Sequence, residues 1–308
     1  MNLRRAILTP ALATSAALAL AACGSGAPAA TNADGTTALS VVASTDVYGA
    51  IAQAIGGDAV KVTSIINSPD ADPHEYEAKP ADAVAVDEAK VLVYNGAGYD
   101  DFATKLLAAS GTKPTTIDVS ELSGLQAPAG GTFNEHVWYS FPTVKKLAST
   151  LAADLGAADP AQASTFTANA TAFNAKIDGL TAKLDAVKAA HSGEKVGITE
   201  PVPLYMVQAA GLVDATPAEF SQAVEEGTDP PAAVLADTLK TLQGPDKVKA
   251  LLPNAQTETP LTKQVEQAAT AGGVPVVKVS ETLPAGVTDY VAWMTQQVDA
   301  LAAALGTS

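Results

Sequence analysis

The sequence predicts an α/β fold of two lobes, each a parallel sheet flanked by helices, with one long α-helix as a bridge and a crevice between the lobes. Three observations support this prediction. Short runs of β-branched residues alternate with helical patterns over residues 39–119, a long apolar stripe follows over residues 160–190, and the alternation returns after residue 193. Strands that alternate with helices typically form a parallel sheet covered on both faces.

The first lobe is expected to span residues 39–158. Its predicted strands are Leu39–Ser44, Val60–Ile66, Val91–Tyr94 and Thr115–Val119. Its predicted helices are Val47–Ile55, Pro80–Ala89, a helix that ends at Ala109, and a helix that follows Ser140. Pro80 and Pro142 lie in the first turn of their helices, where the missing N–H group of proline costs no hydrogen bond. Residues 124–134 are rich in proline and glycine and predict a loop.

The bridging segment is expected to cover residues 159–192. Its apolar side chains recur at helical intervals and are Phe166, Phe173, Ile177, Leu180, Leu184 and Val187. This spacing places them on one face of a helix over residues 160–190. Such a helix is longer than the average in globular domains, and its length suits a connector that packs against two lobes.

The second lobe is expected to span residues 193–308. Its predicted strands are Lys195–Thr199, Lys249–Leu252 and Pro275–Val279. Its predicted helices are one from Pro201 or Pro203 to Ala210, then Ala232–Leu242, Leu261–Thr270 and Val287–Leu305. Ligands of open parallel sheets bind beyond the carboxyl ends of the strands. We therefore expect a binding site in the crevice between the lobes.

The N-terminal residues 1–22 are typical of a lipoprotein signal peptide. Arg4 and Arg5 precede an Ala/Leu-rich stretch that is too short for a membrane span, and small residues lead up to Cys23. Cleavage there would leave Cys23 lipidated on the outer face of the cytoplasmic membrane, with residues 23–38 as a flexible tether. An ordinary secretory cleavage site is the alternative. Because Cys23 is the only cysteine, an internal disulfide and a cysteine-based zinc site are excluded.

The charge balance of the chain is strongly acidic. Asp and Glu number 33 against 18 Lys and Arg, which gives a formal net charge of −15 at pH 7. Phosphate backbones and anionic lipid surfaces repel such a chain, so nucleic acid is excluded as a partner. Contact with the membrane is expected through the lipid anchor.

Four side chains are candidate metal ligands because they lie where predicted strands of both lobes end. His74 lies in the loop after the second strand, and His136 follows the irregular loop after the fourth strand. Glu200 directly follows the first strand of the second lobe, and Glu281 closely follows its last strand. Neutral imidazole together with carboxylate suits a divalent transition ion.

Each candidate also has a purely structural interpretation. His74 could be a solvated loop residue, and His136 could pack beside the neighbouring tryptophan. Glu200 could favour the start of a helix through the helix dipole, and Glu281 could be an exposed turn residue. Their joint placement at strand ends in both lobes favours a shared site. The third histidine, His191, lies at the C-terminal end of the long helix, where it interacts well with the dipole, and is expected to be structural.

Six stretches of the sequence carry a resemblance to a known family. They are ASTDVYGAIAQAIGG, DPHEYE, KVLVYNGAGYDD, EHVWYS, GITEPVPLY and SETLPAGVTDYVAWM. In this order, and over nearly the whole predicted mature chain, they resemble the metal-binding lipoproteins of bacterial ABC importers for zinc and manganese, the cluster A-I or TroA-like solute-binding proteins. The family fold has two α/β lobes bridged by one long helix, in agreement with the prediction above.

The resemblance implies a protein that is not an enzyme. It implies capture of Zn²⁺ or Mn²⁺ and delivery to an ABC permease by a monomer. Position by position, His74 and His136 match the two histidines of the family's first lobe, and Glu200 matches the third ligand. Glu281 matches a position that is usually Asp, and Glu135 stands where the family often has Pro.

The choice of metal stays open at the level of the sequence. Two imidazoles and two carboxylates suit manganese somewhat better than a three-histidine site would, yet zinc binds such donors more tightly, and iron is a minor option. Many zinc-specific relatives carry a His/Asp-rich loop before the second histidine, whereas the loop LQAPAGGTFNE has no histidine. Two other classes remain: an extracytoplasmic zinc hydrolase, with Glu75 or Glu77 as the general base, and an adhesin or scaffold lipoprotein with a structural metal.

Overall fold

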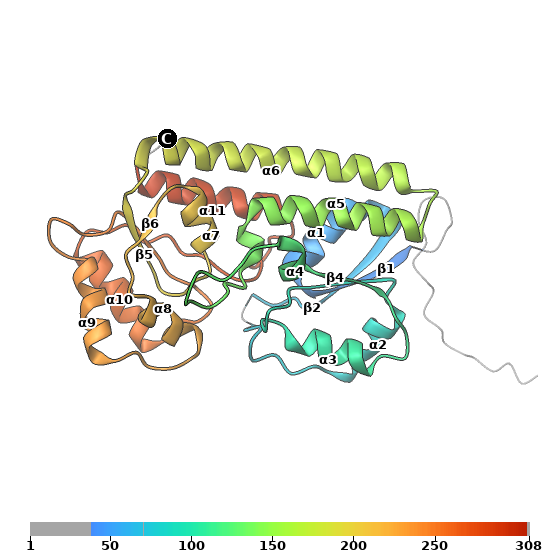
Figure 1. The fold of residues 1–308 in the computed structure, drawn as a ribbon, viewed down its shortest axis with the longest axis horizontal. Helices are drawn as coiled ribbons and strands as arrows, with labels where there is room; N and C mark the ends of the chain where they lie inside the picture. Colours follow the sequence, from blue (N-terminus) through green and yellow to red (C-terminus); the bar gives the residue numbers. More distant parts are fainter. Residues whose placement is uncertain (1–37, 70, 307–308) are drawn as a thin grey trace, which may run out of the picture.

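The structure is a computed structural model that describes residues 38–69 and 71–306. The predicted signal peptide, the predicted lipidation site Cys23 and nearly all of the predicted tether over residues 23–38 lie outside these described residues. Among the described helices, none combines the length and the apolar character that crossing a bilayer requires. Figure 1 shows two α/β lobes side by side along one long helix, as the sequence predicts.

The first lobe is built on a four-stranded parallel sheet with the order β2-β1-β3-β4. Its strands are β1 (Leu39–Thr45), β2 (Val60–Ile66), β3 (Val91–Tyr94) and β4 (Thr115–Asp118). Its α-helices are α1 (Asp46–Gly56), α2 (Pro80–Glu88), α3 (Asp101–Ala109), α4 (Val119–Ser123) and α5 (Phe141–Ala158). Two short 3₁₀ helices complete it, η1 (Gly57–Ala59) and η2 (Val137–Tyr139). The four strands predicted for this lobe all form.

Both faces of this sheet are covered, because successive side chains of a strand point to opposite faces. Val41 of β1 packs into the core cluster that contains residues of α1 and α5, whereas Val42 packs with Val86 of α2 and Phe102 of α3. In Figure 1, α5 lies above the sheet and α2 and α3 lie below it. Val41 and Val42 are both fully buried. Because helices cover both faces of the sheet, a binding site of this lobe has to lie in the loops beyond the strand ends.

The second lobe contains a three-stranded parallel sheet with the order β6-β5-β7. Its strands are β5 (Lys195–Ile198), β6 (Val213–Asp214) and β7 (Leu251–Leu252). Its helices are α7 (Leu204–Ala209), α8 (Ala218–Glu225), α9 (Ala232–Thr241), α10 (Pro260–Ala271) and α11 (Tyr290–Ala304). The sheet is smaller than that of the first lobe, and strands β6 and β7 have only two residues each.

Three features of the second lobe differ from the predictions. The segment 275–279 pairs with the chain at β7 only through isolated parallel bridges. Val277 and Val279 donate to the carbonyls of Leu251 and Pro253, but Pro253 has no N–H group to donate in return, so the ladder is interrupted. Strand β6 and helix α8 form where the sequence predicts no element, since such short elements show no clear periodicity. Helix α11 begins at Tyr290 rather than at Val287, because the side chain of Asp289 caps it.

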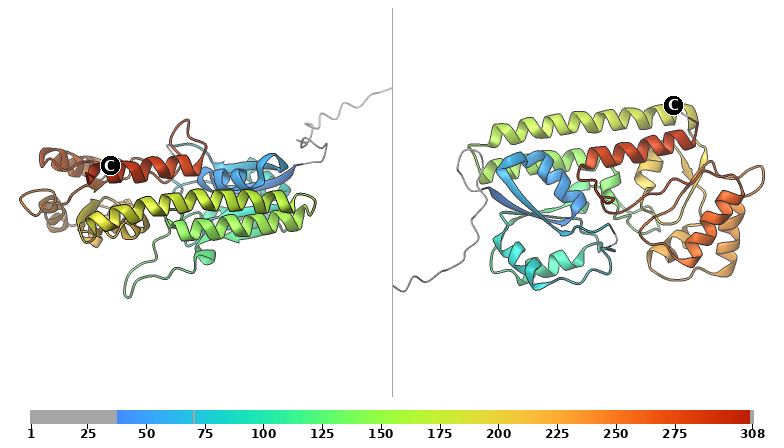
Figure 2. Two further views of the ribbon diagram at one scale, coloured as in Figure 1. Left: turned by 90° about the horizontal axis from the view of Figure 1, so that it is seen from above. Right: turned by 180° about the vertical axis from the view of Figure 1, so that it is seen from behind.

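Helix α6 (Ala163–His191) confirms the predicted bridge between the lobes. All six residues of its apolar stripe are buried. The helix packs against α1 and α5 of the first lobe and against α7 and α11 of the second, and Figure 2 shows it running along both lobes. At its C-terminal end, Nδ1 of His191 lies 3.0 Å from Oε2 of Glu194. His191 therefore has the structural position that the sequence predicts.

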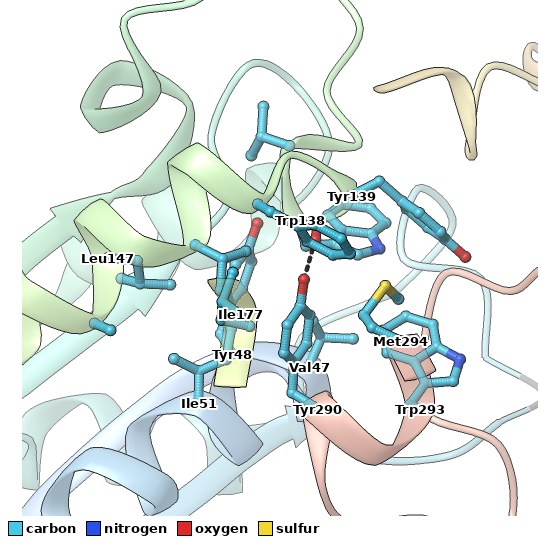
Figure 3. Packing of buried hydrophobic residues seen from close by; sticks show 14 of the residues in the cluster. Val47, Tyr48, Ile51, Trp138, Tyr139, Leu147, Ile177, Tyr290, Trp293 and Met294 are labelled. Carbon is cyan, nitrogen blue, oxygen red and sulfur yellow. Dashed lines mark hydrogen bonds between the residues drawn. The ribbon is translucent and has the colours of Figure 1, made fainter. Parts of the chain in front are cut away.

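The two lobes share one hydrophobic core. Trp138 and Tyr139 of η2 belong to the same buried cluster as Tyr290 of α11 and the stripe of α6. The hydroxyl of Tyr290 donates to the carbonyl of Trp138 at 2.5 Å, as Figure 3 shows. The hydroxyl of Tyr139 donates to the carbonyl of Ser280 at 2.8 Å. Because η2 directly follows His136, this packing fixes that histidine relative to the second lobe.

Candidate metal centre

His74 lies in the loop between β2 and α2, beyond the carboxyl end of the strand. Its backbone N–H donates to Oδ1 of Asp72 at 2.9 Å, which closes a tight turn around Pro73. Its ring meets the ring of Tyr99 edge-on, with centroids 5.0 Å apart. The side chain of His74 is 29% exposed and lines a surface pocket of about 450 Å³. His74 is thus the solvent-facing donor of the site.

Acidic neighbours control the protonation of His74. Burial disfavours the charged ring, but the carboxylates of Glu225, Glu281 and Glu135 outweigh burial and raise the pKa of His74 to about 9. The ring is therefore protonated at neutral pH when no cation competes for its neighbours. A metal ion that binds to His74 has to displace this proton.

His136 directly precedes η2 and is fully buried. The side-chain oxygen of Asn134 accepts hydrogen bonds from the backbone N–H of His136 at 3.1 Å and from its Nδ1 at 2.8 Å. The amide nitrogen of Asn134 donates to the carbonyl of Pro201 at 3.0 Å, which fixes the amide orientation. Nδ1 therefore carries the proton, and Nε2 keeps its lone pair for a ligand. Burial lowers the pKa of His136 to about 4, so the ring stays neutral.

The side chain that joins these two histidines is Glu225, the last residue of α8. Its Oε1 lies 3.3 Å from Nε2 of His74 and 3.5 Å from Nε2 of His136. Ligand atoms of the three side chains all lie within 4.8 Å of one another. The group therefore combines two nitrogen donors from the first lobe with a carboxylate from the second.

No sequence signal singles out Glu225. It stands beside Glu226 in a stretch without a predicted element, and consecutive acidic residues are common on protein surfaces. Only tertiary contact places it in the site. Gln222, on the same helix, donates from Nε2 to Oγ1 of Thr132 at 2.8 Å, and Thr132 belongs to the loop that leads to His136.

The two predicted carboxylate ligands are buried and lie together, outside this group of three. Glu200 follows β5 and is 1% exposed, and Glu281 follows the edge segment and is 3% exposed. The side-chain amide of Asn254 donates to both, at 2.5 Å to Oε2 of Glu200 and at 2.8 Å to Oε1 of Glu281. The hydroxyl of Thr257 donates to Oε1 of Glu200. The structure thus brings the predicted histidines together and, separately, the predicted glutamates.

The acids of the site differ in their protonation. Burial, with the charge of Glu225 as a further cause, raises the pKa of Glu281 to about 8 and that of Glu200 to about 7. For Glu225, burial opposes ionisation, but the imidazoles of His136 and His74 outweigh it and lower the pKa. At neutral pH and without a cation, Glu225 is therefore ionised, Glu281 tends to keep its proton, and Glu200 lies near half ionisation.

Several buried atoms of the site have no hydrogen-bond partner within the part of the chain that the structure describes. They include Nε2 of His136, Oε2 of Glu225 and Oε2 of Glu281. Buried polar atoms are normally paired, so their presence in one neighbourhood indicates the place of a ligand. Imidazole nitrogen and carboxylate oxygen together suit a divalent transition ion. The residues present therefore fit a metal.

Comparison with known protein families agrees with this donor set. The sequence profile of the ZnuA family, described as zinc-uptake complex component A, periplasmic, matches residues 41–304. The chain belongs to this family. The resemblance seen in the sequence is thus confirmed. ZnuA-family proteins are extracytoplasmic solute-binding components rather than enzymes, which supports the prediction of a non-enzymatic protein outside the cytoplasm.

Individual relatives show the same likeness. The chain is 30% identical over 157 residues to the manganese-binding lipoprotein MntA of Halalkalibacterium halodurans, covering 50% of this chain and 51% of the relative. It is 28% identical over 171 residues to the iron-binding protein YfeA of Yersinia pestis, covering 54% and 53%. The chain thus spans about half the length of these curated relatives. A crystal structure of ZnuA matches with a TM-score of 0.69 and 25% identity over 87% of this chain and 97% of that one, which confirms the predicted fold.

Proposed function

We propose that this protein captures a divalent transition metal, Zn²⁺ or Mn²⁺, outside the cytoplasm and delivers it to an ABC permease for import. The observation that carries the proposal is the convergence of His74, His136 and Glu225, whose ligand atoms lie within 4.8 Å of one another. Membership in the ZnuA family supports it, as do relatives named for manganese and iron binding. The metal is cargo, so the site has to bind it reversibly.

The ligands that we propose from the sequence are His74, His136, Glu200 and Glu281. Both glutamates are held by the amide of Asn254, and one oxygen of Glu281 is buried without a hydrogen-bond partner among the described residues. A divalent ion favours ionised carboxylates and neutral imidazoles, which is the opposite of the protonation of His74 and Glu281 in the metal-free site. Binding therefore releases protons.

The donor set leaves zinc and manganese as the two main candidates, with iron as a third. Carboxylates suit Mn²⁺, whereas imidazoles suit Zn²⁺ and iron. With identical donors Zn²⁺ binds more tightly than Mn²⁺. Selection of manganese would therefore have to come from the number and geometry of the ligands.

We also propose that Cys23 carries a lipid anchor and that residues 23–38 tether a monomer to the outer face of the cytoplasmic membrane. The MntA relative is named a lipoprotein, which supports this proposal. The net charge of −15 disfavours adsorption of the folded part on anionic lipid. The lobes would then stay free to meet the permease.

The test is a calorimetric titration of Mn²⁺ and Zn²⁺ into the metal-stripped mature chain. We expect one ion per molecule and loss of binding in His74→Ala. The matched control is His191→Ala on α6, which we expect to bind as the wild type does. Thermal unfolding of the metal-free variants verifies that both fold. A wild type that binds neither metal would refute the proposal.

A further inference from the structure

We infer that Glu225 is a further ligand of the metal, one that raises the number of protein ligands above four and favours Mn²⁺ over Zn²⁺. This inference rests on the proposed function and deepens it by naming the class of ion that the site selects. It adds a residue of α8, in the second lobe, to the donors that the sequence predicts.

The spacing of Glu225 from the histidines is that of ligands sharing one ion. Its Oε1 lies 3.3 Å from Nε2 of His74 and 3.5 Å from Nε2 of His136. Two donors that bind one ion at about 2.1 Å lie roughly 3.0–3.4 Å apart at octahedral or tetrahedral angles. An ion between these three atoms therefore requires little rearrangement.

Helix α8 contacts both lobes: it packs against the second lobe and donates a hydrogen bond to a loop of the first lobe. Phe220 of α8 is buried in a hydrophobic cluster of the second lobe. Gln222, one turn before Glu225 on the same face of the helix, donates to Oγ1 of Thr132 at 2.8 Å. Thr132 lies in the loop before η2, drawn in green, which reaches toward the second lobe in Figure 1. The carboxylate therefore approaches the histidines from a packed helix.

The environment of the carboxylate also fits a ligand. Oε2 of Glu225 is buried and has no hydrogen-bond partner among the described residues. A carboxylate that only balanced the charge of His74 would be expected to have its second oxygen solvated or hydrogen-bonded. The unpartnered Nε2 of His136 lies in the same buried place. Both atoms are thus available to one cation.

A fifth protein donor changes which ions the site favours. Together with Glu200 and Glu281, Glu225 gives three carboxylates beside two imidazoles. Structural zinc sites are almost always four-coordinate and tetrahedral, whereas carboxylate-rich sites of higher coordination suit Mn²⁺. Glu225 is therefore expected to contribute more to manganese binding than to zinc binding.

The test compares Mn²⁺ and Zn²⁺ affinities of four metal-stripped mature proteins by calorimetry. They are the wild type, Glu225→Gln, Glu225→Asp and the matched control Glu226→Gln, which alters the exposed neighbouring residue. In Glu225→Gln we expect the Kd for Mn²⁺ to rise about tenfold or more and the Kd for Zn²⁺ to change by less than about threefold. Glu225→Asp keeps the charge but shortens the reach, so Mn²⁺ binding is expected to weaken there too. The control is expected to match the wild type.

Three results would overturn the inference. Unchanged or tighter Mn²⁺ binding in Glu225→Gln would assign the carboxylate to charge balance alone. Wild-type affinity in Glu225→Asp would show that charge matters and reach does not. Equal losses for both metals would remove the selectivity. A wild type that binds neither metal would instead refute the proposed function, so the two failures are distinguishable. Thermal unfolding of the metal-free variants verifies that they fold. If Glu225→Gln does not fold, the Mn²⁺ and Zn²⁺ affinities of Glu225→Asp decide the test.

Discussion

The first lobe brings imidazoles to the junction, and the second lobe brings carboxylates. His74 and His136 extend from loops beyond the first sheet, whereas Glu200, Glu225 and Glu281 come from the second lobe. Each half by itself supplies only one kind of donor, nitrogen from the first lobe and oxygen from the second. The complete donor set therefore forms only where the two lobes meet.

The two halves are also oriented by amides in different ways. In the first lobe, the oxygen of Asn134 accepts from His136 and fixes one tautomer. In the second lobe, the nitrogen of Asn254 donates to Glu200 and Glu281 and holds two acids at one point. Asn134 thus leaves the lone pair of His136 Nε2 free for a ligand, and Asn254 holds two carboxyl groups close together. Variants of each half test this division.

The largest effect is expected from loss of the buried donor of the first lobe. His136→Phe removes both ring nitrogens but keeps a ring beside Trp138, whose centroid lies 5.1 Å away. The Kd for Mn²⁺ and Zn²⁺ is expected to rise about 100-fold or more, because a ligand is lost outright. Calorimetry measures the change, and His191→Phe is the matched control. Wild-type affinity in His136→Phe would contradict the role of the first lobe.

A smaller effect is expected from the amide of the second lobe. Asn254→Leu removes the donor that Glu200 and Glu281 share while both acids stay buried. The free energy of unfolding of the metal-free protein is expected to fall by about 1–3 kcal/mol. Urea denaturation in the presence of a chelator measures this change. Gln208→Leu, on the exposed side of α7, is expected to change stability by less than about 0.5 kcal/mol. Equal stability of Asn254→Leu and wild type would argue against the shared donor.

The smallest effect is expected from pH, because His74 is partly exposed. The pKa of His74 is raised from 6.5 to about 9 by its acidic neighbours against the effect of burial. Its contribution to stability is therefore complete below pH 6.5 and lost as pH rises through 9. Burial raises the pKa of Glu281 from 4.5 to about 8. Its contribution to stability is likewise complete below pH 4.5 and lost as pH rises through 8.

The metal-free protein is thus expected to lose unfolding free energy as pH rises from 4.5 to 8 through Glu281 and from 6.5 to 9 through His74. His136 acts in the opposite sense at lower pH: burial lowers its pKa to about 4, so its contribution is lost as pH falls through that value. Urea denaturation with a chelator at several pH values measures both trends. In His74→Gln the loss at high pH is expected to be smaller. A gain of stability as pH rises over these windows would contradict the protonation described for His74 and Glu281.

The parts of the fold that could be predicted are those with long or repeated patterns. The stripe of α6 repeats over a helix of 29 residues, and the strands of the first lobe are β-branched runs bounded by turns. The segment 275–279 has the composition of a strand, but Pro253 on the neighbouring segment cannot donate to it, and only isolated bridges form. The local sequence indicates strand propensity, whereas the number of backbone hydrogen bonds that a strand forms depends on the neighbouring segment.

The candidate site could be predicted in part for the same reason. His74, His136, Glu200 and Glu281 follow strands, and strand ends meet at one edge of a sheet. Glu225 follows a short helix that leaves no periodic signal, and its position depends on contacts of α8 with a loop of the other lobe. A residue placed by tertiary contact alone carries no local mark in the sequence.

The continuous core has a consequence for how long the cargo is retained. One buried cluster extends from α1 through Trp138 to Tyr290 of α11. A wide rotation of the lobes would separate these side chains and expose apolar surface at about 25 cal/mol per Å². Close-packed interfaces resist such gradual opening. If the protein carries a metal as proposed, spontaneous opening of the lobes would rarely release the ion, and its residence time would depend on a partner that separates the lobes.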